Sequence, residues 1–191
     1  MNVYVIPEDF RKDQYILKPI VKAMLAAIGK PRANVRVCQD PLLGGVTEAL
    51  KWERIKEILD LYRGMVQVFL LIVDRDGQDG RQIALNTLEK KAVAALPEDR
   101  IFFAENAWQE VEVWLLAGHD LPKAWSWQDI RQDPNPKEAY FLPFAENRGV
   151  TDEPGQGRKS LAREAAGNYA KIRSRCTEDV VALEKRLSKR I

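Results

Sequence analysis

The chain has 191 residues, of which 46% are hydrophobic and 30% charged, and its net charge is +2. This composition predicts one soluble globular domain with a core of its own and excludes a disordered or fibrous chain. It also excludes a membrane-spanning helix, because no apolar run approaches the ~20 residues that such a helix needs. The start "MNVYVIPEDF" lacks the features of a signal peptide, and Cys38 and Cys176 are far apart without metal-binding spacing. We therefore expect free thiols and a cytoplasmic location.

The predicted elements alternate between strands and helices along the first part of the chain. Strands are expected at "NVYVI" (2–6), "NVRVCQ" (34–39), "MVQVFLLIV" (65–73) and "RIFFA" (100–104), and helices at 13–29, in the latter part of 42–64, at 81–96 and at 106–118. The third strand is apolar without interruption, which indicates burial on both faces. This order predicts an α/β fold with a mostly parallel sheet of about four strands, covered by helices on both sides.

Several residues are expected to begin, end or bend these helices. Pro19 should kink the first helix or mark its early turns, and Gly29 should cap its C-terminus. Asn106 is expected to cap the helix at 106–118. His119 follows that helix and is the only histidine, which argues against zinc sites built on histidines and against a Ser-His-Asp triad. We expect it to be a surface residue or a charge at the helix end.

Three regions are expected: a core at 1–118, an irregular Pro-rich excursion at 119–157, and a basic helical segment at 158–191 packed on the core. Trp125 and Trp127 are expected to hold the excursion against the body, in preference to stacking on bases. The C-terminal segment has ten Lys/Arg and four Asp/Glu, which suits contact with a polyanion and equally an ordinary solvated helix. Its docking stripe is predicted to be Leu161, Ala165, Tyr169 and Ile172.

Carboxylates gather where the predicted strands end. Glu8 and Asp9 follow the first strand, and Asp74 and Asp76 follow the third, with Asp79 in the next loop. The carboxyl ends of parallel strands meet at one edge of the sheet, where ligands bind in such folds. The helix after the fourth strand adds Glu110 and Glu112, and helical geometry alone does not decide which of the two faces this edge.

Clustered acids repel one another, by about 1 kcal/mol per close pair even in water, and a divalent cation removes that cost. Oxygen ligands without histidine or thiolate favour Mg²⁺ or Mn²⁺. The alternative is that "DRDGQDG" is only a polar turn before a helix. It does not fit a calcium loop, because Leu85 stands where the last ligand should be a glutamate. An aspartate-based phosphatase or phospho-receiver is a further alternative, although "FFAEN" lacks the Ser or Thr that a receiver needs after its fourth strand.

Three short motifs in order resemble the Toprim domain, and more narrowly the small Toprim-like proteins related to OLD-family nucleases. "PEDFRKDQY" supplies Glu8, Asp13 and Tyr15 of the first motif, with Asp9 in place of a glycine. "DRD" supplies the Asp-x-Asp after the third strand, and "VEVW" supplies a glutamate two residues before Trp114, which favours Glu112 over Glu110. The resemblance covers about residues 1 to 118.

The resemblance implies metal-dependent hydrolysis of phosphodiester bonds. Glu8, Asp74, Asp76 and Glu112 would hold one or two Mg²⁺ or Mn²⁺ ions, and Glu8 or Glu112 would act as the general base. Lys159 is the first candidate to steady the charged phosphate, with Arg158 second.

The same resemblance implies a nucleic-acid substrate, DNA in preference to RNA, with the backbone contacted by Arg158, Lys171, Arg173 and Arg175. It further implies a role in anti-phage defence with a partner ATPase. The ATPase would be a separate protein, because this chain has no Walker loop. A non-catalytic interaction or regulatory module of the same fold is the alternative hypothesis, and the oligomeric state is left open.

Overall fold

The protein is a four-stranded parallel sheet with helices on both faces. A computed structural model describes all residues, 1–191. The strands are β1 (Asn2–Pro7), β2 (Asn34–Val37), β3 (Val68–Asp74) and β4 (Ile101–Ala107), in the order β2-β1-β3-β4. All three neighbouring pairs are parallel, so the predicted α/β class, the strand count and the strand direction are confirmed.

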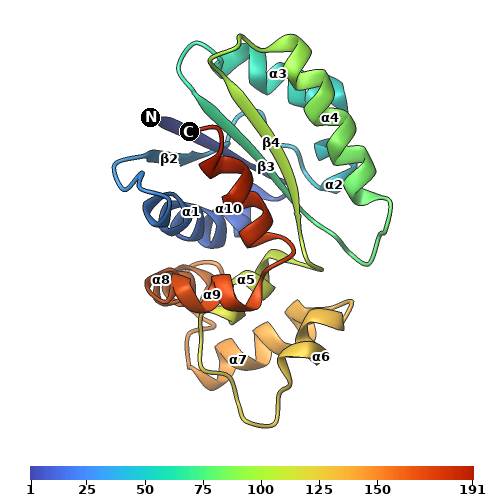
Figure 1. Cartoon of the computed structure of the whole chain (residues 1–191). Coiled ribbons are helices and arrows are strands. Elements are labelled where there is room, and N and C mark those ends of the chain that lie inside the picture. The colour runs from blue at the N-terminus through green and yellow to red at the C-terminus, as the bar shows by residue number, and fades with distance from the viewer.

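The helices fall into two layers and a group beyond the sheet. They are α1 (Phe10–Ala27), α2 (Val46–Ala49), α3 (Trp52–Tyr62), α4 (Arg81–Ala95), α5 (Val111–Ala117), α6 (Trp127–Gln132), the π-helix η1 (Lys137–Phe141), α7 (Leu142–Asn147), α8 (Arg158–Gly167), α9 (Tyr169–Arg175) and α10 (Val180–Ser188). Figure 1 shows α3 and α4 on one side of the sheet and α1 on the other, with α6 and α7 at the far end. None of these helices is both long and apolar enough to pass through a membrane.

Alternating side chains of the strands feed two separate hydrophobic cores. Val5, Leu70 and Ile72 face α1, α5 and the C-terminal helices, whereas Phe69 and Leu71 face α3 and α4. This division is what a strand buried on both faces requires, because successive side chains point to opposite sides. The uninterrupted apolarity of β3 therefore follows from its central place in the sheet.

The ends of α1 follow the sequence signals. Asp9 caps its N-terminus by accepting a hydrogen bond from the Arg11 amide at 2.9 Å. Pro19 lies inside the helix without ending it. Gly29 follows the helix with φ of +80°, and the amides of Gly29 and Lys30 donate to the carbonyls of Ala26 and Leu25. The predicted glycine cap is thus confirmed.

The prediction that Asn106 caps a helix is wrong. Pairing of β4 with β3 continues as far as Asp74 opposite Ala107, so Asn106 is a strand residue opposite Val73. The helix begins only at Val111, after a turn in which Gln109 has φ of +69°. Polar residues at the end of a central strand hide its true length, because the apolar pattern stops before the pairing does.

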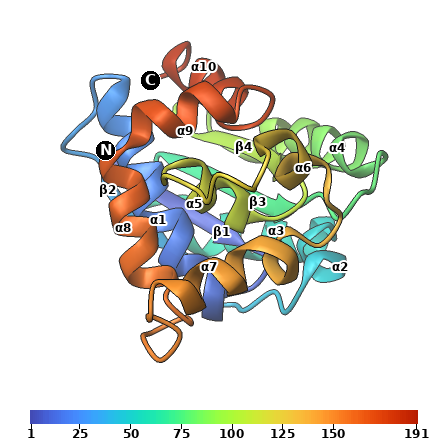
Figure 2. The ribbon, with the colours of Figure 1, turned by 90° about the horizontal axis from the view of Figure 1, so that it is seen from below.

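The Pro-rich excursion lies over the carboxyl ends of the strands. It contains the short helices α6, η1 and α7, which lie toward the viewer when the molecule is seen from below (Figure 2). Trp125 packs edge-on against Tyr140 at 5.2 Å between ring centroids, and the Trp127 indole N–H donates to the Arg175 carbonyl at 3.1 Å. Both tryptophans are half-buried and pack against the main hydrophobic core, so the packing role expected for them is confirmed.

The C-terminal segment is helical and docks through its predicted stripe, since Leu161, Ala165, Tyr169 and Ile172 are all buried. Helix α8 approaches the end of α5 so closely that a Cβ added at Gly118 would lie 2.5 Å from the Ala165 Cα atom. The Asn168 side-chain amide donates to the Gly118 carbonyl at 3.1 Å. A glycine is therefore required at this crossing.

His119 is not a surface residue, contrary to the sequence-based expectation. Its side chain is 4% exposed and its Nε2 atom lies 2.9 Å from the Leu161 carbonyl oxygen. Burial is the main cause that lowers its pKa, so the neutral imidazole is favoured. The ring follows the end of α5 and contacts the first turn of α8 through Leu161.

Candidate functional site

Carboxylates from several elements converge at the carboxyl edge of the sheet. Glu8 follows β1, Asp74 ends β3, and Glu112 lies in the first turn of α5. The Glu8 carboxylate accepts a hydrogen bond from the Asp74 amide at 3.1 Å, and the Asp74 carboxylate accepts one from the Val111 amide at 2.8 Å. These two contacts tie β1 to β3 and β3 to the start of α5.

Asp13, on the first turns of α1, belongs to the same group. Its side chain is buried and accepts a hydrogen bond from the Asp9 amide at 3.1 Å. Burial raises its pKa to about 8, with the charges of Glu112 and Glu8 as further causes. Sequence analysis quoted Asp13 as part of a motif but did not place it in the site. Its place four residues after the capping Asp9, in the first turn of the helix that follows Glu8, could have marked it.

The pKa values show that these acids share one electrostatic environment. Burial raises the pKa of Asp74 well above its usual range, and the charges of Glu8, Glu112 and Asp13 raise it further. Burial also raises the pKa of Glu8, aided by Asp76 and opposed by the Asp74 amide and by Arg81. We call Glu8, Asp13, Asp74 and Glu112 the acidic cluster. Burial and the neighbouring charges favour a proton or a cation beside Glu8, Asp13 and Asp74.

One cation already lies against this cluster, and it comes from the C-terminal segment. Arg158 is completely buried, and its Nε atom donates to the Glu112 carboxylate at 2.9 Å, with its Nη2 atom in close contact with the same oxygen. The guanidinium also lies over the Phe141 ring, 4.5 Å from its centroid, and donates to the Gly155 carbonyl. A buried charge needs such partners, so this pair fixes Glu112.

Asp76 lies at the rim of the site. Its side chain is 44% exposed and pairs with Arg81, a buried residue at the start of α4, at 3.0 Å. Asp76 has φ of +50°, and the turn is held by Gln109, whose backbone carbonyl accepts from the Arg75 and Asp76 amides. The Gln109 side chain accepts from the Gly77 amide at 2.9 Å. The turn that carries Asp-x-Asp is thus fastened to the β4–α5 turn.

Glu110, the alternative to Glu112 as the glutamate that faces the carboxyl edge, is also buried but has another role. Its carboxylate accepts from the Lys137 amide at 2.7 Å, and the Lys137 ammonium lies 3.5 Å from it. Because Lys137 begins η1, Glu110 fastens the excursion over the carboxyl edge. Glu112 instead lies close enough to Asp74 and Asp13 for its charge to raise the pKa of both.

The remaining basic candidates lie in different surroundings. The Lys159 side chain is exposed on α8 and makes no ion pair, whereas its neighbour Arg158 faces inward. Arg158 has no exposed surface with which to meet a nucleic-acid backbone, so its predicted phosphate contact gives way to the pair with Glu112. The other three have internal partners: Lys171 pairs with Asp120, Arg173 with Glu184, and Arg175 donates to the carbonyls of Ala117 and His119.

A hollow of about 450 Å³ adjoins Glu8. It is lined by the β1–α1 turn and by the loop before α2, which contributes Gly44 and Gly45. Both glycines have positive φ, and a Cβ at either would meet no atom within 4 Å. Arg11 lines the hollow together with Glu8.

The acidic cluster offers only oxygen ligands, the kind that a hard divalent ion prefers. In this structure no group of three or more acidic, histidine or cysteine side chains is arranged to hold a metal ion as it stands. The chemistry of the donors fits nevertheless, because the cluster consists of oxygen ligands alone and carries more negative charge than Arg158 offsets. Glu8 and Asp74 each use one carboxylate oxygen in a backbone hydrogen bond and keep the other. Binding would require these side chains to turn toward one another.

Asp179 holds the site together from outside it, and sequence analysis did not find it. It is fully buried and accepts from the Trp108 amide at 2.8 Å, the Trp114 indole at 2.7 Å and Arg131 at 3.1 Å. It thereby joins α10 and α6 to the β4–α5 turn. Its position just before an apolar helical run is a capping signal that could have marked it, and its carboxylate does accept from the Val180 amide.

No family model, curated protein or solved structure matches the chain. The Toprim and OLD-family resemblance therefore stays a prediction from three short motifs. The structure itself supplies a cluster of coupled carboxylates at the binding edge of a parallel sheet, with one buried arginine against it. Such a cluster can take up protons, bind a cation, or hold the fold together through its backbone hydrogen bonds.

Proposed function

We propose that the chain is a Mg²⁺- or Mn²⁺-dependent nuclease that hydrolyses phosphodiester bonds of nucleic acid. The observation that carries the proposal is the convergence of Glu8, Asp13, Asp74 and Glu112 at the carboxyl edge of the sheet, where Glu8 accepts from the Asp74 amide and burial raises the pKa of Glu8, Asp13 and Asp74. Acids brought together in a mostly buried place raise the free energy of the folded chain unless a proton or cation joins them. A divalent ion bound among these acids would remove this cost in free energy.

Each residue has a role in this proposal. Glu8, Asp74 and Asp13 would hold the ion, with Asp76 at the rim and Glu112 oriented by Arg158. When bound, the ion would lower the pKa of a water molecule and offset charge on the phosphate. Glu8 has the raised pKa that suits a general base, and Arg81 lies close enough to lower that pKa. Lys159 on the exposed side of α8 remains the predicted phosphate contact.

Several finer points belong to the same proposal. The substrate is DNA in preference to RNA, the biological setting is anti-phage defence with a partner ATPase, and the location is the cytoplasm. The last is supported by Cys38 and Cys176, which are both free and buried.

The direct test is cleavage of plasmid, single-stranded DNA and single-stranded RNA with Mg²⁺ or Mn²⁺. Asp74→Asn should abolish cleavage, because it removes charge from the centre of the cluster. Asp79→Asn is the matched control, since Asp79 belongs to the same loop but is exposed and pairs only with Arg75. Equal activity in both variants, or none in the wild type with any metal, would overturn the proposal.

A second candidate function is a non-catalytic interaction or regulatory module. The buried pair of Arg158 and Glu112 favours it, because a guanidinium there offsets part of the charge that an ion would otherwise neutralise. This candidate predicts that Mn²⁺ leaves the melting temperature unchanged, whereas the nuclease predicts a rise by mass action.

A further inference from the structure

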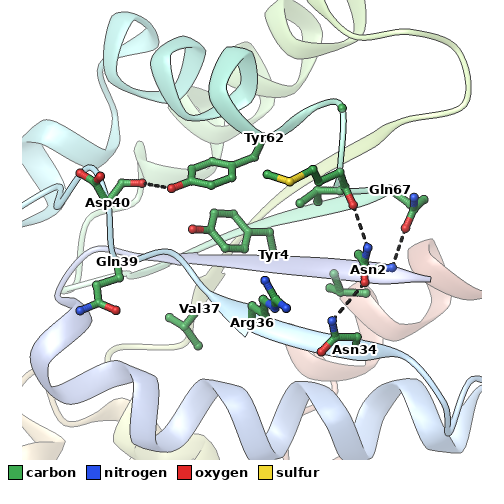
Figure 3. Close-up of a pocket in the computed structure, with 13 residues that line it drawn as sticks. Asn2, Tyr4, Asn34, Arg36, Val37, Gln39, Asp40, Tyr62 and Gln67 are labelled. Carbon is green, nitrogen blue, oxygen red and sulfur yellow. Dashed lines mark hydrogen bonds between the residues drawn. The ribbon is translucent and has the colours of Figure 1, made fainter.

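A second hollow of the molecule lies away from the acidic cluster. Its volume is about 780 Å³, within the usual size of small-molecule sites, and it is lined by the amino-terminal half of β1, by β2 and the residues after it as far as Asp40, and by the turn after α3 (Figure 3). Glu8 lies at the other end of β1. Glu8 follows Tyr4, the last β1 residue of the lining, by four positions, roughly 13 Å at ~3.3 Å per residue. The hollow is thus a separate site.

The hollow exists because one helical layer is narrower than the sheet. Helices α3 and α4 pack against β3 and β4, and α3 ends at Tyr62, after which the chain returns directly to β3. Edge strand β2 has no helix above it on this face. Arg36 of β2 is the register partner of Tyr4, so both side chains point to the same uncovered side.

Two tyrosines form one wall. The rings of Tyr4 and Tyr62 lie 4.6 Å apart between centroids, and the Tyr62 hydroxyl donates to the Asp40 carbonyl at 2.7 Å. Figure 3 shows both rings side by side above β1, with Arg36 next to Tyr4. The aromatic wall is therefore already ordered and would lose little conformational freedom when a planar ligand packs against it.

A row of amides forms the opposite end. Asn34 donates to the Asn2 side-chain oxygen at 3.1 Å, Asn2 donates to the Met65 carbonyl at 2.8 Å, and the Gln67 side-chain oxygen accepts from the Asn2 backbone amide. These bonds fix the row but leave the Gln67 Nε2 donor and the Asn34 Oδ1 acceptor without a protein partner. The two groups lie on either side of Asn2, with β1 between them, so each can make a separate hydrogen bond to a polar ligand.

The lining has one basic and one acidic side chain, Arg36 and Asp40, and the arginine has no partner. Arg36 is exposed and makes neither an ion pair nor a hydrogen bond, and Asp40 is the only acid of the lining. Lys30 and Arg32, in the turn that leads into β2, have no ion-pair partner either. An unpaired guanidinium in the middle of a cavity suits a phosphate. A single carboxylate is too few for a metal site, and the polar lining does not suit a lipid chain.

We propose that this hollow binds a nucleotide, with the phosphate on Arg36, the base against the tyrosine wall, and Asn34 and Gln67 making separate hydrogen bonds to its polar groups. The ligand is either a free mononucleotide or one nucleotide of a single strand, which share this chemistry. Binding here is independent of catalysis at the acidic cluster, so it stands whether or not the chain is a nuclease.

The experiment titrates the full chain, in EDTA, with AMP, GMP, CMP, UMP and inorganic phosphate, and separately with a short single-stranded oligonucleotide. Binding is followed by calorimetry and by amide NMR shifts. A nucleotide should bind more tightly than phosphate alone, with shifts in β2 and the 63–67 turn. Arg36→Gln should weaken binding about tenfold, because the charged hydrogen bonds to phosphate are lost. Lys185→Gln, an exposed lysine on α10, is the matched control and should bind as the wild type does.

Each outcome decides between the possibilities. If the oligonucleotide binds where mononucleotides do not, and Arg36→Gln loses it, the source of the ligand is a polynucleotide. Absence of binding at millimolar concentration, nucleotide binding no tighter than that of phosphate, or unchanged affinity in Arg36→Gln would each overturn the proposal. Loss of binding in Asp74→Asn with Arg36→Gln unaffected would place the ligand at the acidic cluster instead and would equally overturn it.

Discussion

The two ends of β1 carry opposite kinds of polar chemistry. At the carboxyl end, Glu8 belongs to a crowded acidic cluster that is mostly buried, roofed by the excursion, and in contact with Arg158. At the amino end, Tyr4 lines an open hollow in which Arg36 has no partner. Buried charges must be paired, so every contact in the acidic cluster also serves the fold. The polar groups that line the open hollow are not needed to pair buried charges, so their free donors and acceptors are available to a ligand.

The largest effect should come from breaking the buried pair. Arg158→Ala leaves Glu112 buried without its partner and should lower the free energy of unfolding by about 3–5 kcal/mol, measured by urea denaturation. The double variant Arg158→Met with Glu112→Gln should recover part of this loss, because no uncompensated charge remains. A loss below about 1 kcal/mol in Arg158→Ala would show that the pair does not hold α8 to α5.

The second largest effect should be a difference in metal binding between the acidic cluster and the hollow at the other end of β1. If the acidic cluster accepts Mn²⁺, an excess of a hundredfold over the dissociation constant should stabilise the chain by about 2.7 kcal/mol and raise its melting temperature. Asp74→Asn should remove this rise, and Arg36→Gln should keep it. A melting temperature that does not respond to Mn²⁺ in the wild type would favour the non-catalytic module.

The protonation of Asp13 gives a smaller effect. Its pKa in the folded chain, about 8, lies above its ordinary value of 3.8, so the folded state binds the proton more tightly than the unfolded state. Stability without metal should therefore fall as the pH rises from about 4 to about 8. Asp13→Asn imitates the protonated form and should be more stable than the wild type at pH 8, by of the order of 1–2 kcal/mol.

Chemical denaturation at pH 5 and pH 8 checks the prediction for Asp13. The two proteins should differ less at pH 5, where the wild-type carboxyl is already protonated in the fold. A variant that is less stable than the wild type at pH 8 would show that the charged form of Asp13 is needed by the fold.

The smallest effects are expected in the open hollow. Tyr62→Phe removes the hydrogen bond to the Asp40 carbonyl and should cost about 1 kcal/mol. Arg36→Gln should change stability by less than about 0.5 kcal/mol, since the guanidinium has no partner to lose. Thermal melting measures both. A large cost for Arg36→Gln would mean that this side chain supports the sheet edge.

The sequence predicted the sheet because burial on both faces leaves an unbroken apolar run, as in β3, and helices between strands force parallel pairing. It also predicted which strand ends would gather acids. The start of α5 was missed because polar Asn106 continues β4 through backbone pairing, which leaves no mark on side-chain pattern.

Contacts between distant segments were the part that sequence could not supply. Nothing near Arg158 in the chain indicates that it turns inward while Lys159 turns outward, since either residue of a basic pair can face a core. The same holds for Asp179, whose partners Trp108, Trp114 and Arg131 lie far away in the chain. The hollow beside β2 was likewise invisible, because it results from a helix that ends early.

The close crossing at Gly118 sets a limit on how this protein can vary. Helix α8 begins with Arg158 and contacts Gly118 further along, through Ala165. Any side chain at position 118 would therefore push α8 away from α5. The guanidinium would then withdraw from Glu112, although neither residue had been altered. An alanine at position 118 would thus disturb the pairing of the Glu112 carboxylate without contacting it.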